Sequence, residues 1–323
     1  MPCTRIARRT LAGLAAAALL TASHAADNWP AKPIRIIVPT PPAGPSDIAV
    51  RPLAAAVQKA LGQAVIVENR AGANGNIGAA EVARAPADGY TWLWAMDPVL
   101  TVNKHIYKNI GYSSDAIVVL NAAARFSQTL ICNPGLGFKS VKDMLEAAKS
   151  RELTYATGGA GSPGHLVMES LLSSTGVKMV HVPYKGPAPA MQDLMGGQVN
   201  CGFLAAPTVL PQIQSGRVTA LATSGRTRSP LLPTLPTIAE SGYPDFDGTY
   251  WLLLAAPKGV PAEIQKRFLA AMDAAIRSPQ QQERVKAVDI EMVGSSPEQA
   301  QARVREISDK WEALTRKINL KPD

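Results

Sequence analysis

Short apolar runs rich in β-branched residues alternate along the chain with longer segments of helical periodicity. In the first hundred residues, strands are predicted at 34–38, 64–68 and 90–95. The stretches between them predict a helix over 48–61, closed by Gly62 as its C-cap, and a short helix over 79–84. This β-α-β-α-β order is typical of a parallel sheet with right-handed crossovers.

The same alternation restarts after residue 128 and predicts a second α/β unit. Its strands are predicted at 129–132, 153–157, 179–184, 199–204 and 218–224, and its helices at 140–150, 163–174 and 187–195. A proline-rich segment over 228–248 then leads to one more apolar strand at 250–257. The chain ends in two helical patterns, over 261–278 and 297–318.

Two α/β units followed by a further strand and two helices predict a two-lobed α/β protein, each lobe a β-sheet flanked by helices. A chain of 323 residues suits two domains of ordinary size. We expect residues 26–124 and 251–323 to form lobe 1 and residues 125–250 to form lobe 2. The chain would then cross between the lobes more than once.

The N-terminal segment, residues 1–25, has the pattern of a signal peptide and not of a folded element. Three arginines precede an apolar stretch over 11–20, which is too short to span a bilayer with margin. Ser23 and Ala25 then give a small-x-small cleavage pattern, so cleavage is predicted after Ala25. We therefore expect export to the periplasm.

Composition and charge exclude several function classes. The formal net charge is +8, but the basic residues are scattered and not interleaved with aromatic residues, which argues against nucleic-acid binding. His105, His165 and His181 have no metal-ligand spacing, so we expect neither a metal nor another cofactor. Cys132 and Cys201 are left after cleavage, and they are compatible with buried free thiols or with a disulfide.

The first candidate site is the turn in IRIIVPTPPAGPSDIAVR, which follows the first predicted strand. Ligands of open α/β sheets bind beyond the carboxyl ends of the strands, and a helix N-terminus there favours anions. Ala43 and Gly44 leave room for a ligand, and Ser46 or Asp47 can cap the helix. An ordinary capped βα turn fits the same residues. Pro52 leaves the start of this helix open, because it would lie inside a helix that begins near Asp47 but at the first turn of one that begins later.

The second candidate is GAGSPG, over 159–164, between a predicted strand and a predicted helix. It matches a dinucleotide-binding pattern, but the next strand ends in MVHVPYKG without the acid that would hold a ribose. Ser162 does not lie in the nucleophile-elbow pattern of hydrolases. What this loop offers is free amides and the hydroxyls of Thr157 and Ser162, which suit a carboxylate. Lys185, after the next strand, is either an anion partner or a solvated surface lysine, and His165 is interpreted as a structural or capping residue.

Five strings in order carry a resemblance to a known family. They are WPAKPIRIIVPTPPAGPSDIAVR, VENRAGANGNIGAAEVARAPADGYT, YATGGAGSPGHLVMESL, HVPYKGPAPAMQDLMGGQVNCGF and LPTLPTIAESGYP. Together they resemble the Bug family, the extracytoplasmic substrate-binding proteins of tripartite tricarboxylate transporters, over nearly the whole chain after residue 25. The resemblance implies a type II-like periplasmic binding protein with a ligand cleft between its lobes. It also implies a carboxylate ligand, held by one loop from each lobe.

The residues and the resemblance together give one predicted ligand-binding set. It comprises Pro42, Ala43, Gly44, Pro45, Ser46, Asp47, Asn74, Asp97, Thr157, Gly161, Ser162, Lys185, Gly186 and Ala205. The chain departs from the family pattern at Thr40, where an aromatic residue is usual, at Ala43, where glycine is usual, and at Leu204, where an acid is frequent. Asp97 stands where the family usually has a small polar residue, so we expect it to meet an ammonium or hydroxyl group of the ligand or to pair with protein.

The predicted function is capture of a small carboxylate, which is a dicarboxylate, a tricarboxylate, an acidic amino acid or an aromatic acid. The partners implied are the membrane permease subunits of a tripartite transporter, and the protein is expected to be a monomer and not an enzyme. A sensory protein that presents its ligand to a membrane sensor would need the same cleft, so the sequence leaves that alternative open. A hydrolase is a distant third.

Overall fold

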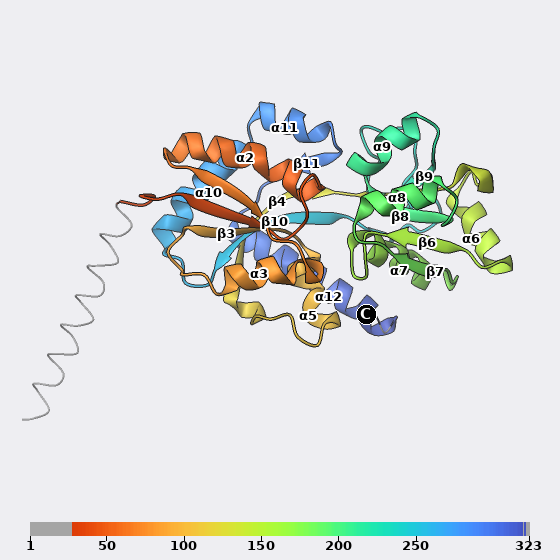
Figure 1. Cartoon of the computed structure of the whole chain (residues 1–323), viewed down its shortest axis with the longest axis horizontal. Helices are drawn as coiled ribbons and strands as arrows, with labels where there is room; N and C mark the ends of the chain where they lie inside the picture. The colour runs from red at the N-terminus through yellow and green to blue at the C-terminus, as the bar shows by residue number, and fades with distance from the viewer. Residues whose placement is uncertain (1–27, 319, 321–323) are drawn as a thin grey trace, which may run out of the picture.

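The computed structural model describes residues 28–318 and residue 320, so the predicted signal peptide and its cleavage after Ala25 lie outside the described residues. Within them the chain forms two β-sheets flanked by helices, arranged as two lobes side by side (Figure 1). The prediction of a two-lobed α/β protein is therefore confirmed. No helix in this part of the chain is long and apolar enough to cross a membrane.

Lobe 1 contains a six-stranded sheet with the order β11-β4-β10-β3-β1-β2. Its strands are β1 (Ile34–Val38), β2 (Val65–Asn69), β3 (Thr91–Met96), β4 (Ile117–Phe126), β10 (Tyr250–Pro257) and β11 (Ile290–Met292). As predicted, β1 pairs in parallel with both β2 and β3. β10 is antiparallel to β3 and β4, so the strand that returns late in the sequence lies in the middle of the sheet.

Helices cover both faces of this sheet (Figure 1). They are α2 (Pro45–Leu61), α3 (Asn76–Ala83), α4 (Pro98–Thr101), α5 (Asn103–Ile106), α10 (Ala262–Ile276), α11 (Pro279–Lys286) and α12 (Pro297–Lys317), with short 3-10 turns at Ala73–Gly75 (η1) and Ser114–Ala116 (η2). α2 buries Leu53 and Val57 and packs against α10, because its apolar residues recur at helical spacing. Trp92 and Trp94 of β3 are fully buried, and Trp92 stacks on Phe268 of α10.

The structure settles where the first helix begins. α2 starts at Pro45 with Gly44 as its N-cap, so Pro52 lies inside the helix. The prediction that Ser46 or Asp47 caps this helix is wrong, because both lie within its first turn and no side chain caps it. Proline has no N–H for the helical hydrogen bond, which normally costs about 3 kcal/mol in a helix interior. The carbonyl of Pro52 accepts a hydrogen bond from the side chain of Gln281 in α11 at 3.2 Å. This contact fastens the middle of α2 to a helix from the far end of the sequence.

Lobe 2 contains a five-stranded sheet with the order β7-β6-β8-β5-β9. Its elements are β5 (Gln128–Cys132), η3 (Pro134–Leu136), α6 (Val141–Ser150), β6 (Thr154–Thr157), α7 (Pro163–Thr175), β7 (Val180–Pro183), α8 (Pro187–Met195), β8 (Cys201–Ala205), α9 (Ala206–Gln214) and β9 (Thr219–Thr223). β6 pairs in parallel with β7 and β8, while β5 is antiparallel to β8 and β9. Both sheets thus combine parallel strands with an antiparallel strand that comes from a chain crossing.

The two chain crossings lie next to each other. β4 ends at Phe126 in one sheet and β5 begins at Gln128 in the other. Ser224 ties the crossings together, since its hydroxyl accepts from the amide of Gln128 at 2.9 Å and donates to the carbonyl of Gly248 at 2.9 Å. We propose that the chain changes lobe at Ser127 and again just before Tyr250, close to the boundaries expected from the sequence.

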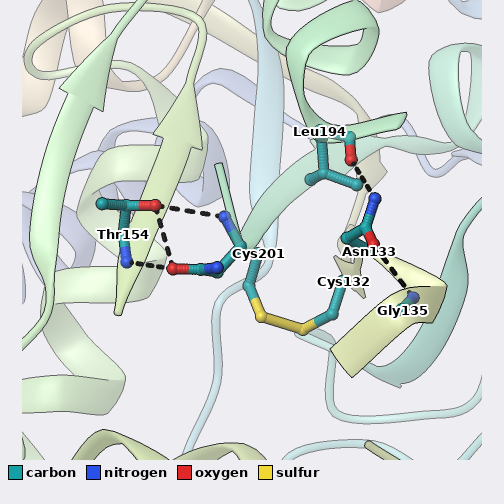
Figure 2. Close-up of a disulfide and its surroundings, with 7 residues drawn as sticks. Cys132, Asn133, Gly135, Thr154, Leu194 and Cys201 are labelled. Atoms are coloured by element: carbon teal, nitrogen blue, oxygen red, sulfur yellow. Dashed lines mark hydrogen bonds between the residues drawn. A yellow bond between two sulfur atoms is a disulfide. The ribbon is translucent and has the colours of Figure 1, made fainter. Parts of the chain in front are cut away.

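Cys132 and Cys201 form a disulfide in lobe 2, which resolves the alternative that the sequence left open. The two residues face each other across the antiparallel β5–β8 pair, and both side chains are fully buried. Figure 2 shows the bond beside Asn133, whose side chain accepts from the amide of Gly135 and donates to the carbonyl of Leu194. The disulfide lies at the end of this strand pair that is away from the chain crossing.

Candidate ligand site

The loop between β1 and α2 is shaped by the buried carboxylate of Asp47. This group accepts hydrogen bonds from the amide of Ala43 at 3.1 Å and the side chain of Asn69 at 3.0 Å, and it pairs with Arg51 at 2.8 Å. Burial raises the pKa of Asp47, but the bonds from Arg51, Ala43 and Asn69 outweigh burial and hold the pKa below its ordinary value. All of these contacts lie within the protein, so Asp47 holds the loop in shape.

Ala43 adopts a left-handed backbone conformation, with φ of 63°. This region strains residues other than glycine. The hydrogen bond from Ala43 to Asp47 fixes the conformation, which explains how alanine serves at a position where the family usually has glycine. Pro42 and Ala43 are exposed at the tip of the loop, whereas Gly44 and Pro45 are half-buried where α2 begins.

The loop between β6 and α7 uses most of its amides internally. The amide of Gly159 donates to the Thr157 hydroxyl at 3.2 Å, and that of Ser162 donates to the Gly159 carbonyl at 3.1 Å. The amide of Gly161 donates to Nδ1 of His165 at 3.0 Å. Gly186 reaches the same loop from the start of α8, since its amide donates to the Gly158 carbonyl at 3.2 Å. These four amides are therefore bonded within the protein, and the prediction that this loop offers free amides is wrong for them.

Three hydroxyl groups around these loops are buried and have no hydrogen-bond partner among the described residues. They belong to Thr40, Ser46 and Ser162. Ser46 lies in the first turn of the 17-residue α2, and Ser162 is the N-cap of the 13-residue α7 in the other lobe. A buried polar atom without a partner costs about 1–3 kcal/mol. Such atoms at two helix N-termini are candidates for contacts to an anionic ligand.

The two lobes touch at two residues of the predicted set. Asn74 of lobe 1 donates from Nδ2 to the carbonyl of Gly161 in lobe 2 at 3.1 Å and to the side chain of Asn103 at 2.9 Å. Asn103 in turn donates to the Asn74 carbonyl at 2.9 Å. A second contact joins Tyr250, at the start of β10, to the carbonyl of Pro163 at 2.9 Å. The sequence offered no signal for Tyr250, which lies in an ordinary apolar strand pattern.

Replacing Asn74 by glycine should shift the ligand-free protein toward a more open arrangement of its lobes. Asn74 has φ of 51°, which glycine adopts without strain, so Asn74→Gly removes the side-chain bonds while it keeps the backbone. Loss of one such bond should lower the ratio of closed to open molecules about fivefold. Fluorescence energy transfer between one label on each lobe would measure this ratio. An unchanged ratio would show that the contact does not hold the lobes together.

The sequence of this chain is similar to those of known proteins over most of its length. The sequence profile of the TctC family, described as the tripartite tricarboxylate transporter family receptor, matches residues 49–320. The protein BugT of Bordetella pertussis is 35% identical over 310 residues, which cover 95% of each chain. The chain belongs to the TctC family.

Solved structures of similar proteins share the fold of this chain. The periplasmic binding protein BugD is 33% identical, with a TM-score of 0.82 over 91% of this chain and 100% of its own. Rpa4515 of R. palustris with adipate is 32% identical, with a TM-score of 0.85 over the same shares. MatC of Rhodopseudomonas palustris with bound malate is 26% identical, with a TM-score of 0.79 over 88% of this chain and 99% of its own. The family consists of periplasmic substrate-binding proteins and not of enzymes, as the sequence predicted.

Asp97 is the most unusual of the predicted TctC site residues. It follows β3, is completely buried, and accepts a hydrogen bond from the amide of Trp251 at Oδ1, at 2.7 Å. Its Oδ2 has no hydrogen-bond partner in the described part of the chain. Burial raises the pKa of Asp97 to about 7, against the lowering effects of the Trp251 amide, Lys310 and Trp311. One oxygen is therefore bonded to protein, and the other is buried without a hydrogen-bond partner among the described residues.

The other predicted residues differ in how close they lie to these contacts. Thr157 is buried at the end of β6, and its hydroxyl contacts the ring of His181 at 2.7 Å. Ala205 is half-buried at the end of β8, opposite Gln128, where the chain enters lobe 2. Lys185 is exposed, which agrees with the interpretation as a solvated surface lysine.

A cavity of about 330 Å³ lies elsewhere between the lobes, on the β4–β11 side of the chain crossings. Residues 125–127 and 225–230 line it together with Thr249 and Trp251, and none of the predicted ligand residues does. Its arginines, Arg125, Arg226, Arg228 and Arg303, are each paired with a carboxylate. Their charge is already compensated, which makes this cavity a poor site for an anion.

Proposed function

We propose that this protein captures a small carboxylate between its lobes and delivers it to the membrane permease of a tripartite transporter. It would act as a periplasmic monomer after cleavage of the signal peptide behind Ala25. Membership in a family of transporter receptors supports this proposal. Two structural neighbours support the ligand class, since one is solved with adipate and the other with malate, which are both dicarboxylates.

The observation that carries the proposal is the pair of buried hydroxyl groups without partners on Ser46 and Ser162. Each belongs to the N-terminal turn of a helix, one helix in each lobe. A hydroxyl can donate to a carboxylate oxygen, and the positive end of a helix dipole adds to the attraction. A carboxylate bound by both serines would satisfy two otherwise orphaned groups. It would also favour the closed arrangement, because only there can it reach both lobes.

A thermal-shift screen of residues 26–323 tests the ligand class. The panel contains adipate, malate, citrate, glutamate and benzoate, with glucose as a neutral control. A ligand at 100 times its dissociation constant should stabilise the protein by about 2.7 kcal/mol. We expect a shift with at least one of the acids and none with glucose. No shift with any acid would count against carboxylate capture.

Substitution of either serine should weaken the binding of the acid found in this screen and leave the fold intact. A hydrogen bond to a charged group contributes about 1.5–3 kcal/mol, so Ser46→Ala and Ser162→Ala should each raise the dissociation constant at least tenfold. The ligand-free variants should be no less stable than the wild type, because each loses a hydroxyl that has no partner. Calorimetric titration and denaturant unfolding measure the two effects.

The matched control is Ser174→Ala. Ser174 lies near the C-terminal end of α7, the helix of which Ser162 is the N-cap. Its hydroxyl already donates to the Leu171 carbonyl at 2.8 Å. This variant should bind the acid with wild-type affinity. If Ser46→Ala and Ser162→Ala bind as tightly as Ser174→Ala does, the two serines are not ligand contacts.

A further inference from the structure

His165 lies in the first turn of α7, three residues after Ser162, which is the N-cap of this helix. It is buried, and its Nδ1 accepts the hydrogen bond from the Gly161 amide at 3.0 Å. The Gly161 carbonyl in turn accepts the bond from Asn74 that joins the two lobes. Nδ1 of His165 therefore fixes the peptide bond between Ala160 and Gly161, and the carbonyl of Gly161 makes the contact to lobe 1.

The ring of His165 is itself held by a column of stacked side chains. His165 stacks on His181 of β7 with ring centroids 3.8 Å apart and planes within 12° of parallel. His181 stacks in the same way on Tyr155 of β6, at 4.9 Å. His181 also contacts the hydroxyl of Thr157, which accepts from the Gly159 amide. The two histidines thus support the loop at both of its ends.

The surroundings of His165 keep its ring neutral. Burial, and next the proximity of His181, lower the pKa of His165 to about 3. The ring of Tyr155 in β6 lies 6.2 Å from that of His165, between centroids, and its hydroxyl donates to the carboxylate of Glu169 in α7. β5 and β8, which also pack against α7, carry no ionisable side chain besides the disulfide cysteines. A neutral ring has one nitrogen free to accept, and the Gly161 amide requires that nitrogen to be Nδ1.

We propose that His165 is a positioning residue of the ligand site, whose Nδ1 holds the Gly161 amide and thereby sets the loop that presents Ser162 to the ligand. The role in binding rests on the proposed function. The role in the loop stands on the hydrogen bonds and can be tested without any ligand. Two variants separate the acceptor atom Nδ1 from the packing of the ring, because asparagine can place an acceptor near the position of Nδ1 whereas leucine cannot.

The first measurement uses the ligand-free wild type. Nitrogen-15 spectra of the imidazole rings at pH 7 should show His165 neutral, with the proton on Nε2 and Nδ1 unprotonated. Hydrogen exchange at the Gly161 amide should be slow in the wild type, similar in His165→Asn, and about tenfold faster in His165→Leu. A proton on Nδ1 of His165, or equal Gly161 exchange in the wild type and His165→Leu, would overturn the proposal.

The second measurement is the affinity for adipate and for malate. We expect His165→Leu to weaken the binding of whichever acid the wild type binds about tenfold, with His165→Asn within about threefold of the wild type. His105→Leu, which alters a half-buried histidine of lobe 1, is the control and should leave affinity unchanged. Equal losses in the asparagine and leucine variants would refute the role of Nδ1. If the wild type binds neither acid, the choice of ligand class fails, while the ring and exchange measurements still decide the role of His165.

Discussion

Removal of the Cys132–Cys201 disulfide is expected to lower the free energy of unfolding of lobe 2 by about 4 kcal/mol. The bond joins residues 69 positions apart, so it closes a long loop and removes much conformational freedom from the unfolded chain. Reduced protein should unfold at a clearly lower urea concentration than oxidised protein. Hydrogen exchange should show the loss in β5 and β8 and not in β1 and β3, because both cysteines belong to the lobe 2 sheet.

Two preparations separate the cross-link from the packing of the sulfur atoms. Reduced wild-type protein keeps both side chains, whereas Cys132→Ala combined with Cys201→Ala also leaves a gap in the core. The reduced wild type should show most of the loss and the double variant slightly more. Ligand affinity should not change, since the bond lies at the end of the β5–β8 pair away from Gln128 and Ala205. A difference below about 1 kcal/mol between oxidised and reduced wild type would mean that the loop-closure argument does not apply.

The periodic features of this fold could be predicted from the sequence, because they depend on local patterns. The parallel pairing of β1 with β2 and β3 follows from the alternation of strands and helices. α8 begins and ends at the predicted residues, Pro187 and Met195. β4, α9, β11 and α11 were not predicted. For β11 and α11 the reason is that a three-residue strand and a strongly polar helix leave almost no hydrophobic pattern.

The contacts of the candidate site depend on tertiary structure and could not be predicted in the same way. The spacing of Cys132 and Cys201 does not reveal that they face each other, because this depends on the register of β5 and β8. From the sequence, Asp47 is a helix cap or a ligand contact, but its bond to Asn69 exists only once β2 lies beside β1. The bond from Gly161 to His165 spans four residues, yet its geometry depends on a left-handed turn at Gly161.

Replacing Asp97 by asparagine is expected to remove a large pH dependence of stability. Burial raises the pKa of Asp97 from 3.8 to about 7, so the folded protein binds a proton more tightly there than the unfolded chain does. The stability contributed by this group is fully present below pH 3.8 and is lost as the pH rises through 7. The loss amounts to about 4 kcal/mol, because each pKa unit corresponds to about 1.4 kcal/mol.

Asparagine resembles the neutral acid, because its Oδ1 can still accept from the Trp251 amide, and it does not ionise. The advantage of Asp97→Asn over the wild type should therefore grow by about 4 kcal/mol between pH 4 and pH 8, as measured by urea unfolding. Asp245→Asn, which alters an exposed carboxylate, is the control and should show no such growth. Identical pH profiles for the wild type and Asp97→Asn would contradict the prediction.

The Oδ2 atom of Asp97 has no hydrogen-bond partner among the described residues, so a donor on the ligand could offset part of the cost of this buried carboxylate. We propose that a ligand hydroxyl or ammonium group donates to this oxygen. Asp97→Asn would then bind malate more weakly relative to adipate, because malate carries a hydroxyl group and adipate does not. If the ratio of the two affinities stays the same while the stability at pH 8 rises, Asp97 acts on folding alone and the ligand makes no contact with it.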